Sequence, residues 1–289
     1  MSRRRNAIIL AAGTSSRFVP LSAECPKGLL TVKGEVMIER QIRQLKEAGV
    51  DDITVVTGYM ADAFEYLKDM FGVDIVFNED FERYNNSSSL VRVLDRLSDT
   101  FICSSDNYFS RNVFLDEVFG SYYSALYAAG PTDEYCIETD SEGNIIKVDV
   151  GGHDSWYMIG HVFFSSNFSE KFSRLLLKEY SDEDTRRGYW EDVYIRHIED
   201  LPPMKINRYA SSEINEFDTL DELRLFDNSY VADTRSRIVG EIAESMGCAQ
   251  SQLSSFRKEK NESGSLQFTF RMDDIAFRYN SFDKSIIRL

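Results

Sequence analysis

One stretch near the start of the chain constrains its fold more than any other. Residues 7–12 read Ala-Ile-Ile-Leu-Ala-Ala, and Gly13, Thr14, Ser15 and Ser16 follow directly. An apolar run that ends in small residues is typical of a strand buried in a parallel sheet. The small residues leave backbone N–H groups open to a ligand, and successive amides in such a turn form an anion site. We therefore predict a buried first strand followed by an anion-binding loop.

Two cations and two prolines extend this loop. Arg17 and Lys27 add fixed positive charge, and Pro20 and Pro26 stiffen the chain between them. A Gly/Ser turn between a strand and a helix would explain residues 13–16 on their own. The full set, with Arg, Pro and Pro-Lys, is far more specific and favours a phosphate ligand.

Composition limits the classes of partner. The chain has 289 residues, 43% of them hydrophobic, which suits one large α/β domain with a small appendage. The formal net charge of −15 argues against nucleic acid or an anionic membrane as a partner. The four cysteines are scattered without metal-ligand spacing, and no stretch has the apolar length of a membrane span, so we expect a cytoplasmic protein.

Strands and helices alternate after the loop. Apolar residues at helical spacing predict a helix over 38–45 with Gly49 as its stop, and a second helix over 62–70. Strands are predicted at 53–57 and 73–77. This β-α-β-α-β order indicates a mixed, mainly parallel sheet in an α/β fold. Ligands of such sheets bind beyond the carboxyl ends of the strands, where the loop lies.

Two polar stretches follow at predicted strand ends. Residues 84–90, Tyr-Asn-Asn-Ser-Ser-Ser-Leu, open a helix that runs to about Leu97, and they serve either as helix caps or as readers of a nucleobase. Residues 101–107 form a buried strand that ends in an acidic residue. Asp106 there either binds Mg²⁺ or caps a helix starting near Asn112.

The second half of the chain adds a hairpin and further helices. Residues 134–139 and 144–148 are predicted to pair around 140–143, and helices are predicted at 168–180, 189–200 and 219–226. A strand is predicted at 204–209. Asp218 precedes the last helix, where it caps the helix, binds a metal ion, or does both.

These motifs resemble a known family. The pattern Leu10-Ala-Ala-Gly-x-x-Ser-Arg-x-x-Pro-Leu, with Pro26-Lys27, resembles the signature loop of nucleotidyltransferases that activate phosphorylated sugars and alcohols. Residues 84–90, 105–107, 189–192 and 216–218 narrow the resemblance to the bacterial CTP:phosphocholine cytidylyltransferases, over about residues 7–226. The resemblance implies a Rossmann-like sheet of the nucleotidyltransferase type. It also implies that CTP and phosphocholine give CDP-choline and pyrophosphate.

The resemblance also implies a set of site residues. Lys27 would meet the α-phosphate and the acceptor phosphate, and Arg17 would hold the triphosphate, which makes these two the predicted catalytic residues. Mg²⁺ would be bound by Asp106, Glu216 and Asp218. The predicted nucleotide-binding residues are Leu10, Ala11, Ala12, Gly13, Thr14, Ser15, Ser16, Arg17, Asn86, Ser88, Ser89 and Ser105.

The acceptor site is predicted from the chemistry of choline. A quaternary ammonium donates no hydrogen bond, so its recognition requires aromatic faces and carboxylates. Aromatic residues are more often core than ligand contacts, and Ser165 stands where a relative carries Asp. The predicted acceptor-binding residues are Tyr135, Trp156, Tyr189, Trp190 and Glu191.

A change of character near residue 228 predicts two domains, 1–228 and 229–289. The second contains a helix over 234–246 and a hairpin around Asp273-Asp274, and it resembles the start of a choline-kinase-like N-terminal lobe. Residues 260–265, which correspond to the kinase phosphate loop, are poor in glycine, so we expect no kinase activity. Because every predicted site residue precedes Asp227, we expect a chain that ends there to keep its chemistry.

Three alternatives remain open. The acceptor is a sugar phosphate or another phosphorylated or phosphonate amine, or the protein is a non-catalytic nucleotide-binding regulator. Retention of Arg17, Lys27, Asp106 and Asp218 together argues against a regulator, which has no need of metal-binding acids. The sequence does not fix the oligomeric state, and a homodimer is one possibility.

Overall fold

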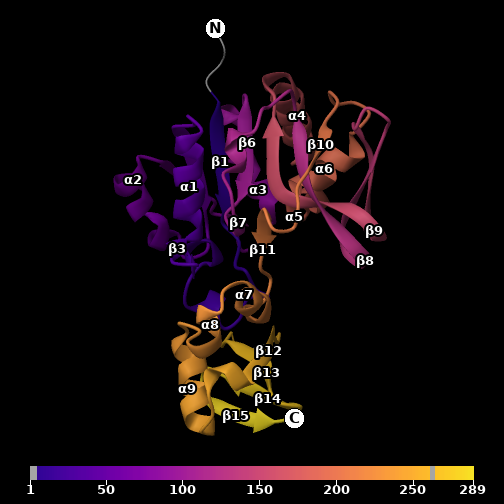
Figure 1. The fold of residues 1–289 in the computed structure, drawn as a ribbon. Helices are drawn as coiled ribbons and strands as arrows, with labels where there is room; N and C mark the ends of the chain where they lie inside the picture. Colours follow the sequence, from indigo (N-terminus) through magenta and orange to yellow (C-terminus); the bar gives the residue numbers. More distant parts are fainter. Residues whose placement is uncertain (1–4, 261–263) are drawn as a thin grey trace. The chain divides into compact units, whose positions relative to one another are not determined.

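The computed structural model describes residues 5–260 and 264–289, and these form two compact units (Figure 1). Unit 1 contains the chain up to Gly13 together with Ile38–Asn215, and unit 2 contains Thr14–Met37 together with Glu216–Leu289. The loop segment that carries Arg17 and Lys27 therefore groups with the C-terminal part of the chain. The predicted boundary between residues 228 and 229 lies inside unit 2.

Unit 1 is built on a seven-stranded sheet in the order β10-β8-β9-β6-β1-β4-β5. Neighbours in β5, β4, β1 and β6 run parallel, β9 is antiparallel to both β6 and β8, and β10 is parallel to β8. This confirms the predicted mixed, mainly parallel sheet. The strands are β1 (Asn6–Ala11), β4 (Asp52–Thr57), β5 (Asp74–Phe77), β6 (Thr100–Ser104), β8 (Tyr122–Thr139), β9 (Ile145–Phe164) and β10 (Lys205–Arg208).

The first crossover helices form where the sequence predicts them. In α1 (Met37–Glu47), Ile38, Ile42 and Leu45 are fully buried, because spacings of three and four residues place them on one helix face. Gly49 follows with a φ of +78°, a backbone conformation that favours glycine. A 3-10 turn η3 (Ala61–Phe64) and α2 (Tyr66–Phe71) provide the second crossover.

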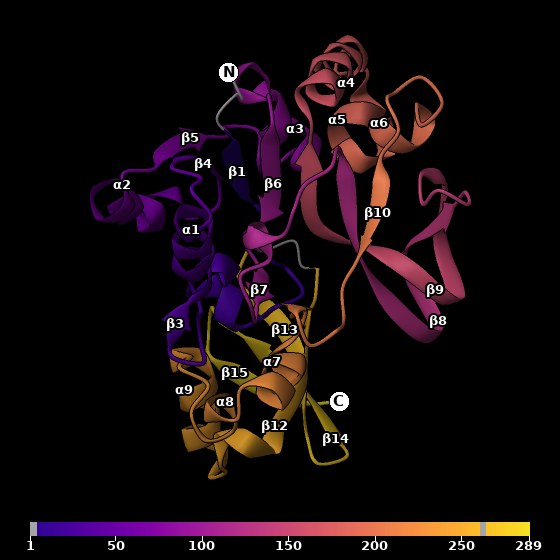
Figure 2. The same cartoon turned by 45° about the horizontal axis from the view of Figure 1, so that its top comes forward.

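Four further helices lie close together in unit 1 (Figure 2). Phe168 and Phe172 of α4, with Trp190 of α6, belong to one buried apolar cluster with sheet residues such as Ile8 and Val162. Two helices are shorter than predicted, since α3 is followed by a separate 3-10 turn η4 (Leu94–Arg96) and α6 ends at Arg196. The helices are α3 (Asn86–Val91), α4 (Ser166–Glu179), α5 (Glu183–Arg187), which was not predicted, and α6 (Trp190–Arg196).

The predicted hairpin is the end of a much longer one. Strands β8 and β9 extend from the sheet as a paired arm that turns at residues 140–143 (Figures 1 and 2). The Asp140 carboxylate shapes this turn by accepting hydrogen bonds from the N–H groups of Glu142 and Asn144, at 2.9 and 2.8 Å. Between β6 and β8 lie β7 (Asn107–Phe109) and a 3-10 turn η5 (Val113–Leu115), which replaces the helix expected near Asn112.

Unit 2 begins with the loop segment, residues 14–37. It contains the 3-10 turns η1 (Leu21–Ala23) and η2 (Lys27–Leu29) and a small hairpin of β2 (Thr31–Val32) and β3 (Glu35–Val36). Lys33 and Gly34 form the hairpin turn with φ values of +48° and +86°. Positive φ at both turn residues suits the twist of a two-residue hairpin loop.

The C-terminal part of unit 2 packs helices on an antiparallel sheet. The predicted stop at Gly247, with a φ of +65°, and the hairpin around Asp273 are confirmed. The α8 helix and strands β12 and β15 were not predicted, and residues 261–263 of the predicted phosphate-loop equivalent lie outside the described residues. Strand β11 (Ile214–Glu216) pairs with β7, and unit 2 resumes at its last residue. The elements that follow are α7 (Leu220–Phe226), α8 (Ser229–Ala232), α9 (Arg237–Met246), η6 (Gln250–Gln252), β12 (Leu253–Lys258), β13 (Gln267–Met272), β14 (Ile275–Asn280) and β15 (Ser285–Arg288).

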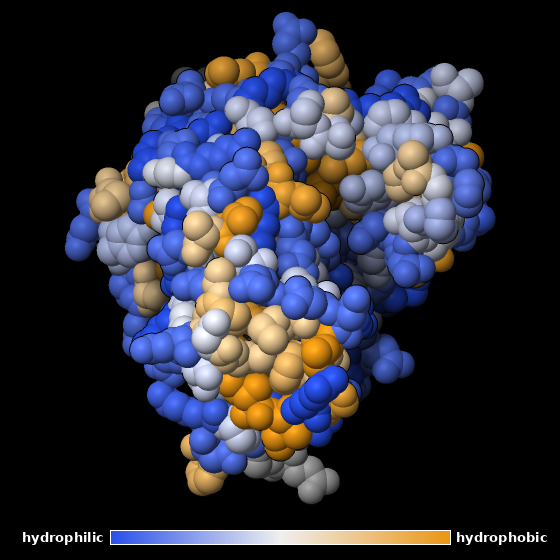
Figure 3. All heavy atoms as spheres, turned by 60° about the horizontal axis from the view of Figure 1, so that its bottom comes forward, coloured by the Kyte–Doolittle hydropathy of each residue, from blue (hydrophilic) through white to orange (hydrophobic). Residues whose placement is uncertain are grey.

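Apolar side chains gather in one patch on unit 2, in the view that brings this unit forward (Figure 3). Exposed apolar residues of the unit include Leu225, Phe282 and Ile287. Patches of this kind commonly mark contact surfaces, but the homodimer stays a prediction. Among the described helices, none combines the length and apolar character that crossing a membrane requires.

Candidate active site

Two cations of the loop segment meet two carboxylates within unit 2. Arg17 Nη1 lies 2.8 Å from Asp218 Oδ2, and Lys27 Nζ lies 3.6 Å from Asp218 Oδ1 and 3.9 Å from Glu216 Oε1. The Lys27 side chain is only 5% exposed, whereas that of Arg17 is 72% exposed. A buried ammonium requires a charge partner, and the two carboxylates supply it. Four predicted site residues are thus brought together.

The role of Asp218 as a helix cap is excluded by its neighbour. Thr219 is the N-cap of α7, since its hydroxyl accepts a hydrogen bond from the Glu222 N–H at 3.2 Å. The Glu222 carboxylate returns to the N–H groups of Asp218 and Thr219, at 2.7 and 3.3 Å, which completes a capping box. The Asp218 carboxylate therefore pairs with Arg17 and Lys27 and does not cap α7.

The carboxyl ends of β1 and β6 bring other predicted residues together in unit 1. Leu10 pairs with Ser104, and the Ser105 N–H donates to the Leu10 carbonyl at 3.0 Å. Asp106 follows in the turn, where its Oδ1 accepts the Ser104 hydroxyl at 2.5 Å. This is the arrangement expected where the carboxyl ends of neighbouring parallel strands meet.

Gly58, which was not predicted from the sequence, packs closely against the carboxyl end of β1. A Cβ at Gly58 would lie 2.6 Å from the Phe81 Cβ and 2.9 Å from the Ala12 carbonyl oxygen. The next residue, Tyr59, donates its N–H to that same carbonyl at 3.1 Å. The end of β1 can therefore approach the β4 loop only because residue 58 has no side chain.

Chemically, the predicted metal ligands suit Mg²⁺, which prefers carboxylate oxygens. The described residues contain no group of three or more His, Cys, Asp or Glu side chains that is arranged to hold a metal ion. Glu216 and Asp218 share Lys27 as a partner, and Asp106 belongs to unit 1. The donor chemistry fits, and magnesium binding stays a prediction.

Ser88 and Ser89 take part in hydrogen bonds within unit 1. Both are buried, and their hydroxyls accept hydrogen bonds from the Asn78 side-chain amide at 2.8 and 3.1 Å. The Ser88 hydroxyl also donates to the Asn85 carbonyl at 2.7 Å. These bonds fix the start of α3, with Asn85 as its N-cap. Reading of a nucleobase by these serines stays a prediction without a supporting contact.

Asn86 instead links α3 to α6. Its side-chain oxygen accepts the Trp190 N–H at 2.8 Å, and its amide donates to Glu191 Oε2 at 3.1 Å. The other oxygen of Glu191 accepts the Tyr123 hydroxyl at 3.0 Å. Tyr123 lies on β8 and was not predicted, because nothing in the sequence pairs it with residue 191.

Tyr189 and Tyr135 extend this group. The Tyr135 hydroxyl donates to Asp192 Oδ1 at 2.8 Å, and its ring meets the Tyr189 ring edge-on at a centroid distance of 6.3 Å. Asp192 Oδ2 accepts the Tyr189 N–H at 2.8 Å. The Tyr189 side chain is 44% exposed. We call Asn86, Tyr123, Tyr135, Tyr189, Glu191 and Asp192 the acidic–aromatic group.

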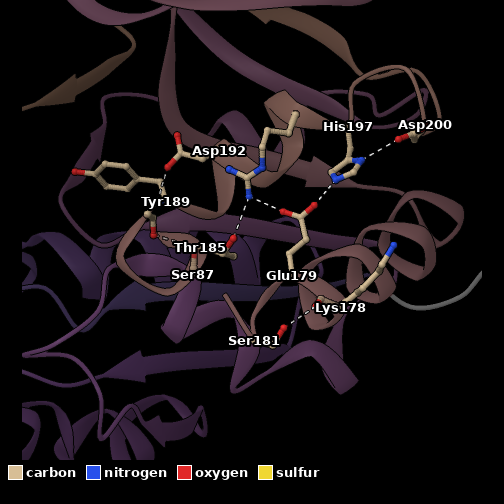
Figure 4. Close-up of polar contacts among 11 residues, drawn as sticks. Ser87, Lys178, Glu179, Ser181, Thr185, Tyr189, Asp192, His197 and Asp200 are labelled. Atoms are coloured by element: carbon tan, nitrogen blue, oxygen red, sulfur yellow. Dashed lines mark hydrogen bonds and ion pairs between the residues drawn. The ribbon is translucent and has the colours of Figure 1, made fainter. Parts of the chain in front are cut away.

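Ion pairs link α4 to α6, the helix that contains Glu191 and Asp192 of this group. Figure 4 shows Glu179 of α4 bound to His197, which directly follows α6. Glu179 also pairs with the Arg196 guanidinium at 2.5 Å. In the same view the Tyr189 ring points away from these ion pairs. The pKa of His197 is raised by its own hydrogen-bond partners, Asp200 first and then Glu179. The protonated form of His197, which pairs with Glu179, is therefore favoured.

The side chain of Glu191 is a weaker acid than an ordinary glutamate. Desolvation by burial raises its pKa to about 7, against the opposing effect of the hydrogen bonds from Asn86 and Tyr123. Asp192 adds a smaller increase through its negative charge. A carboxylate that is costly to ionise gains most from a cationic ligand, which would restore its charged form.

Two predicted acceptor residues, Trp190 and Trp156, pack against residues other than Glu191 and Asp192. The Trp190 ring is 2% exposed and stacks on Tyr123 within the core, so it supports the group from inside. Trp156 packs edge-on against Tyr127, and the Arg208 guanidinium lies 5.3 Å from its ring centroid. Ser165 precedes α4 and bonds to Ser121. Of the predicted aromatic residues, Tyr135 and Tyr189 are those that contact Asp192, the sequence neighbour of Glu191.

A mainly parallel sheet, a Gly/Ser loop with Arg17 and Lys27, and facing carboxylates define a nucleotidyltransferase. The MobA-like NTP transferase domain family matches residues 7–146. A 2-aminoethylphosphonate cytidylyltransferase of Lancefieldella rimae is 34% identical over 81% of this chain and 97% of its own. The chain therefore belongs to the bacterial cytidylyltransferases of the MobA-like nucleotidyltransferase family, and it is an enzyme of that type.

Two further relatives agree with this assignment. The choline-phosphate cytidylyltransferase of Streptococcus pneumoniae is 30% identical over 75% of this chain and 95% of its own. A solved structure of the CTP:phosphocholine cytidylyltransferase from that species matches with a TM-score of 0.75 and 30% identity, covering 78% of this chain and 99% of the other. The predicted fold is confirmed, and the regulator alternative falls. None of these matches shows the predicted choline-kinase-like lobe.

Proposed function

We propose that this protein transfers the cytidylyl group of CTP to a phosphorylated amine, with phosphocholine as the first candidate acceptor. The observation that carries the proposal is a pair of carboxylates among tyrosines. The half-buried Glu191 accepts the Tyr123 hydroxyl, and its neighbour Asp192 accepts the hydroxyl of Tyr135, whose ring meets the Tyr189 ring. Buried negative charge next to aromatic edges and faces suits an ammonium group. A neutral sugar would gain nothing from this charge, so sugar phosphates are disfavoured.

The loop segment would handle the phosphates. Lys27 and Arg17 carry the positive charges that the α-phosphate and the leaving pyrophosphate require, in a protein whose overall charge of −15 repels polyanions. The Lys27 side chain is buried and lies within ion-pair distance of Glu216 and Asp218, so its charge is oriented before the reaction begins. An oriented cation stabilises the charge that develops as the acceptor oxygen attacks phosphorus.

Magnesium is part of this proposal. Asp106, Glu216 and Asp218 are the residues that would hold Mg²⁺, which supplies charge neutralisation to the transferring phosphate when bound. Arg17 and Lys27, which pair with Asp218 in this structure, would supply the positive charge that faces the phosphate oxygens of CTP.

A second acceptor is favoured by a specific observation. Trp190 is in the core and Trp156 faces Arg208, so two of the four predicted aromatic rings are not available to an ammonium group beside Glu191. A primary ammonium donates hydrogen bonds, and the carboxylates of Glu191 and Asp192 can accept them. The second candidate is therefore 2-aminoethylphosphonate, the substrate named for the Lancefieldella relative.

One assay separates these acceptors. Pyrophosphate release is measured with CTP and, in turn, phosphocholine, phosphoethanolamine, 2-aminoethylphosphonate and glucose 1-phosphate. We expect phosphocholine to exceed phosphoethanolamine at least about tenfold in kcat/KM, because three buried methyl groups favour it by about 2 kcal/mol. A higher kcat/KM with 2-aminoethylphosphonate would establish the second candidate, and activity only with the sugar phosphate would refute both.

A further inference from the structure

The segment after Asp227 contacts the loop that carries Lys27, within unit 2. Residues 228–289, which we call the C-terminal segment, contain α8, α9 and the four-stranded sheet. The proposed function assigns no role to them. Their contacts with the loop segment concentrate on both sides of Lys27.

The first contact lies three residues before Lys27. The Ser236 hydroxyl donates to Glu24 Oε2 at 2.5 Å, and the Ile238 N–H donates to Oε1 at 3.3 Å. Ser236 is also the N-cap of α9, accepting the Val239 N–H at 3.1 Å. The Glu24 carboxylate therefore sits at a helix start, where backbone N–H groups favour negative charge.

The second contact lies four residues after Lys27. The carbonyl oxygen of Thr31 accepts two hydrogen bonds, from the Tyr230 hydroxyl at 2.8 Å and from Arg235 Nη1 at 2.5 Å. Tyr230 is fully buried, and the Arg235 guanidinium lies 4.3 Å from its ring centroid. Arg235 Nη2 also donates to the Ser229 hydroxyl at 2.8 Å. Both donors are thus held in place by other contacts of the C-terminal segment.

Asp227, the residue just before the C-terminal segment, bonds to the hairpin turn beyond Thr31 and is itself held by Ser229 of the segment. Asp227 Oδ2 accepts the Lys33 N–H at 2.6 Å, while Oδ1 accepts the N–H and hydroxyl of Ser229 at 3.0 and 2.7 Å. Burial of Asp227 acts to raise its pKa, but these hydrogen bonds outweigh it and hold the pKa below its usual range. The carboxylate stays ionised at neutral pH and keeps all three bonds.

We propose that the C-terminal segment positions Lys27 for nucleotidyl transfer, with Tyr230, Arg235 and Ser236 as positioning residues. The segment holds the Glu24 side chain and the Thr31 backbone carbonyl, so the six residues between them have little freedom to move Lys27. The inference rests on the proposed role of Lys27 in the transfer. It reverses the expectation that a chain ending at Asp227 keeps its chemistry.

The test removes both donors to Thr31 from the full-length chain. Tyr230→Phe keeps the buried ring, and Arg235→Met keeps a long side chain without hydrogen-bond donors. We expect the double variant to lose about tenfold or more in kcat, with KM for CTP changed less than about threefold, because misplacing a catalytic group affects mainly the transition state. Arg278→Met is the matched control, since Arg278 pairs with Glu259 within the C-terminal sheet at 2.6 Å and should leave kcat unchanged.

A second background separates positioning from general damage. In a Lys27→Met protein the same double substitution should lower the residual rate by less than about twofold, because its effect acts through Lys27. An undiminished tenfold loss in that background, or no loss in the native background, would overturn the inference. Where the double variant fails to fold, Tyr230→Phe alone is used, with a loss of about threefold expected.

Hydrogen exchange keeps the inference distinct from the proposed function. Amides of residues 29–32 should exchange faster in the Tyr230→Phe variant than in the native or Arg278→Met protein. Unchanged exchange would overturn the inference that the C-terminal segment holds the Lys27 loop. Full activity of Lys27→Met would instead refute the proposed role of the loop. That result would remove Lys27 as the target of positioning, whatever the exchange data show.

Discussion

Glu191→Gln should stabilise the protein and weaken acceptor binding in the same molecule. The substitution keeps the shape of the side chain and both hydrogen bonds, since the amide oxygen accepts from Asn86 while the Tyr123 hydroxyl rotates to accept from the amide nitrogen. It removes only the charge. A residue whose charge costs stability but serves a ligand is expected at a functional site.

The size of the stability change follows from the pKa of Glu191. Burial raises this pKa from 4.5 to about 7, a difference worth about 3 kcal/mol when the carboxylate is fully ionised. Glu191 is half-buried, so solvent screening reduces the expected gain to about 2 kcal/mol. Because the folded protein binds this proton more tightly than the unfolded chain, the native protein loses this stability as the pH rises from 4.5 to 7. The gain from Gln is therefore largest at pH 8 and small at pH 5.

Two measurements check this prediction. Urea unfolding at pH 5 and pH 8 gives the free energy of unfolding of the native, Glu191→Gln and Glu170→Gln proteins, the last being an exposed control. Steady-state kinetics at pH 8 should show KM for the phosphorylated amine at least about tenfold higher in Glu191→Gln, equivalent to about 1.4 kcal/mol, with KM for CTP unchanged. A stability difference that does not depend on pH would refute the raised pKa. An unchanged acceptor KM would remove Glu191 from the acceptor site.

Three further predictions address other residues. Lys27→Ala should lower turnover by about 100-fold or more in a protein that circular dichroism shows to be folded, because it removes a charge aimed at the transition state; full turnover would contradict the loop assignment. Asp106→Asn and Asp218→Asn should each abolish Mg²⁺-dependent pyrophosphate release with little change in melting temperature, since Thr219 and not Asp218 caps α7; a large drop in melting temperature with retained activity would make the residue structural. Tyr189→Ala should raise KM for the amine without loss of stability, whereas Trp190→Ala should cost about 3–5 kcal/mol in urea unfolding because its ring is in the core; the reverse pattern would exchange their roles.

Local patterns were enough to predict the elements that place the loop. The apolar run before Gly13, the helical spacing of Ile38, Ile42 and Leu45, and the stops at Gly49 and Gly247 are all confirmed. Each depends on residues within a few positions of one another, whose periodicity and backbone preferences act in the same way in any fold. The signature motif also gave the correct family.

Contacts between distant residues needed the folded chain. Trp190 and Tyr189 are neighbours with similar side chains, and only the packing of α6 places one ring in the core and leaves the other partly exposed. Tyr123 meets Glu191 across 68 positions, and Tyr230 meets Thr31 across 199. No local pattern encodes such pairs, because their proximity is created by the packing of whole elements. For the same reason, the grouping of the Lys27 loop with the C-terminal segment follows from tertiary structure alone.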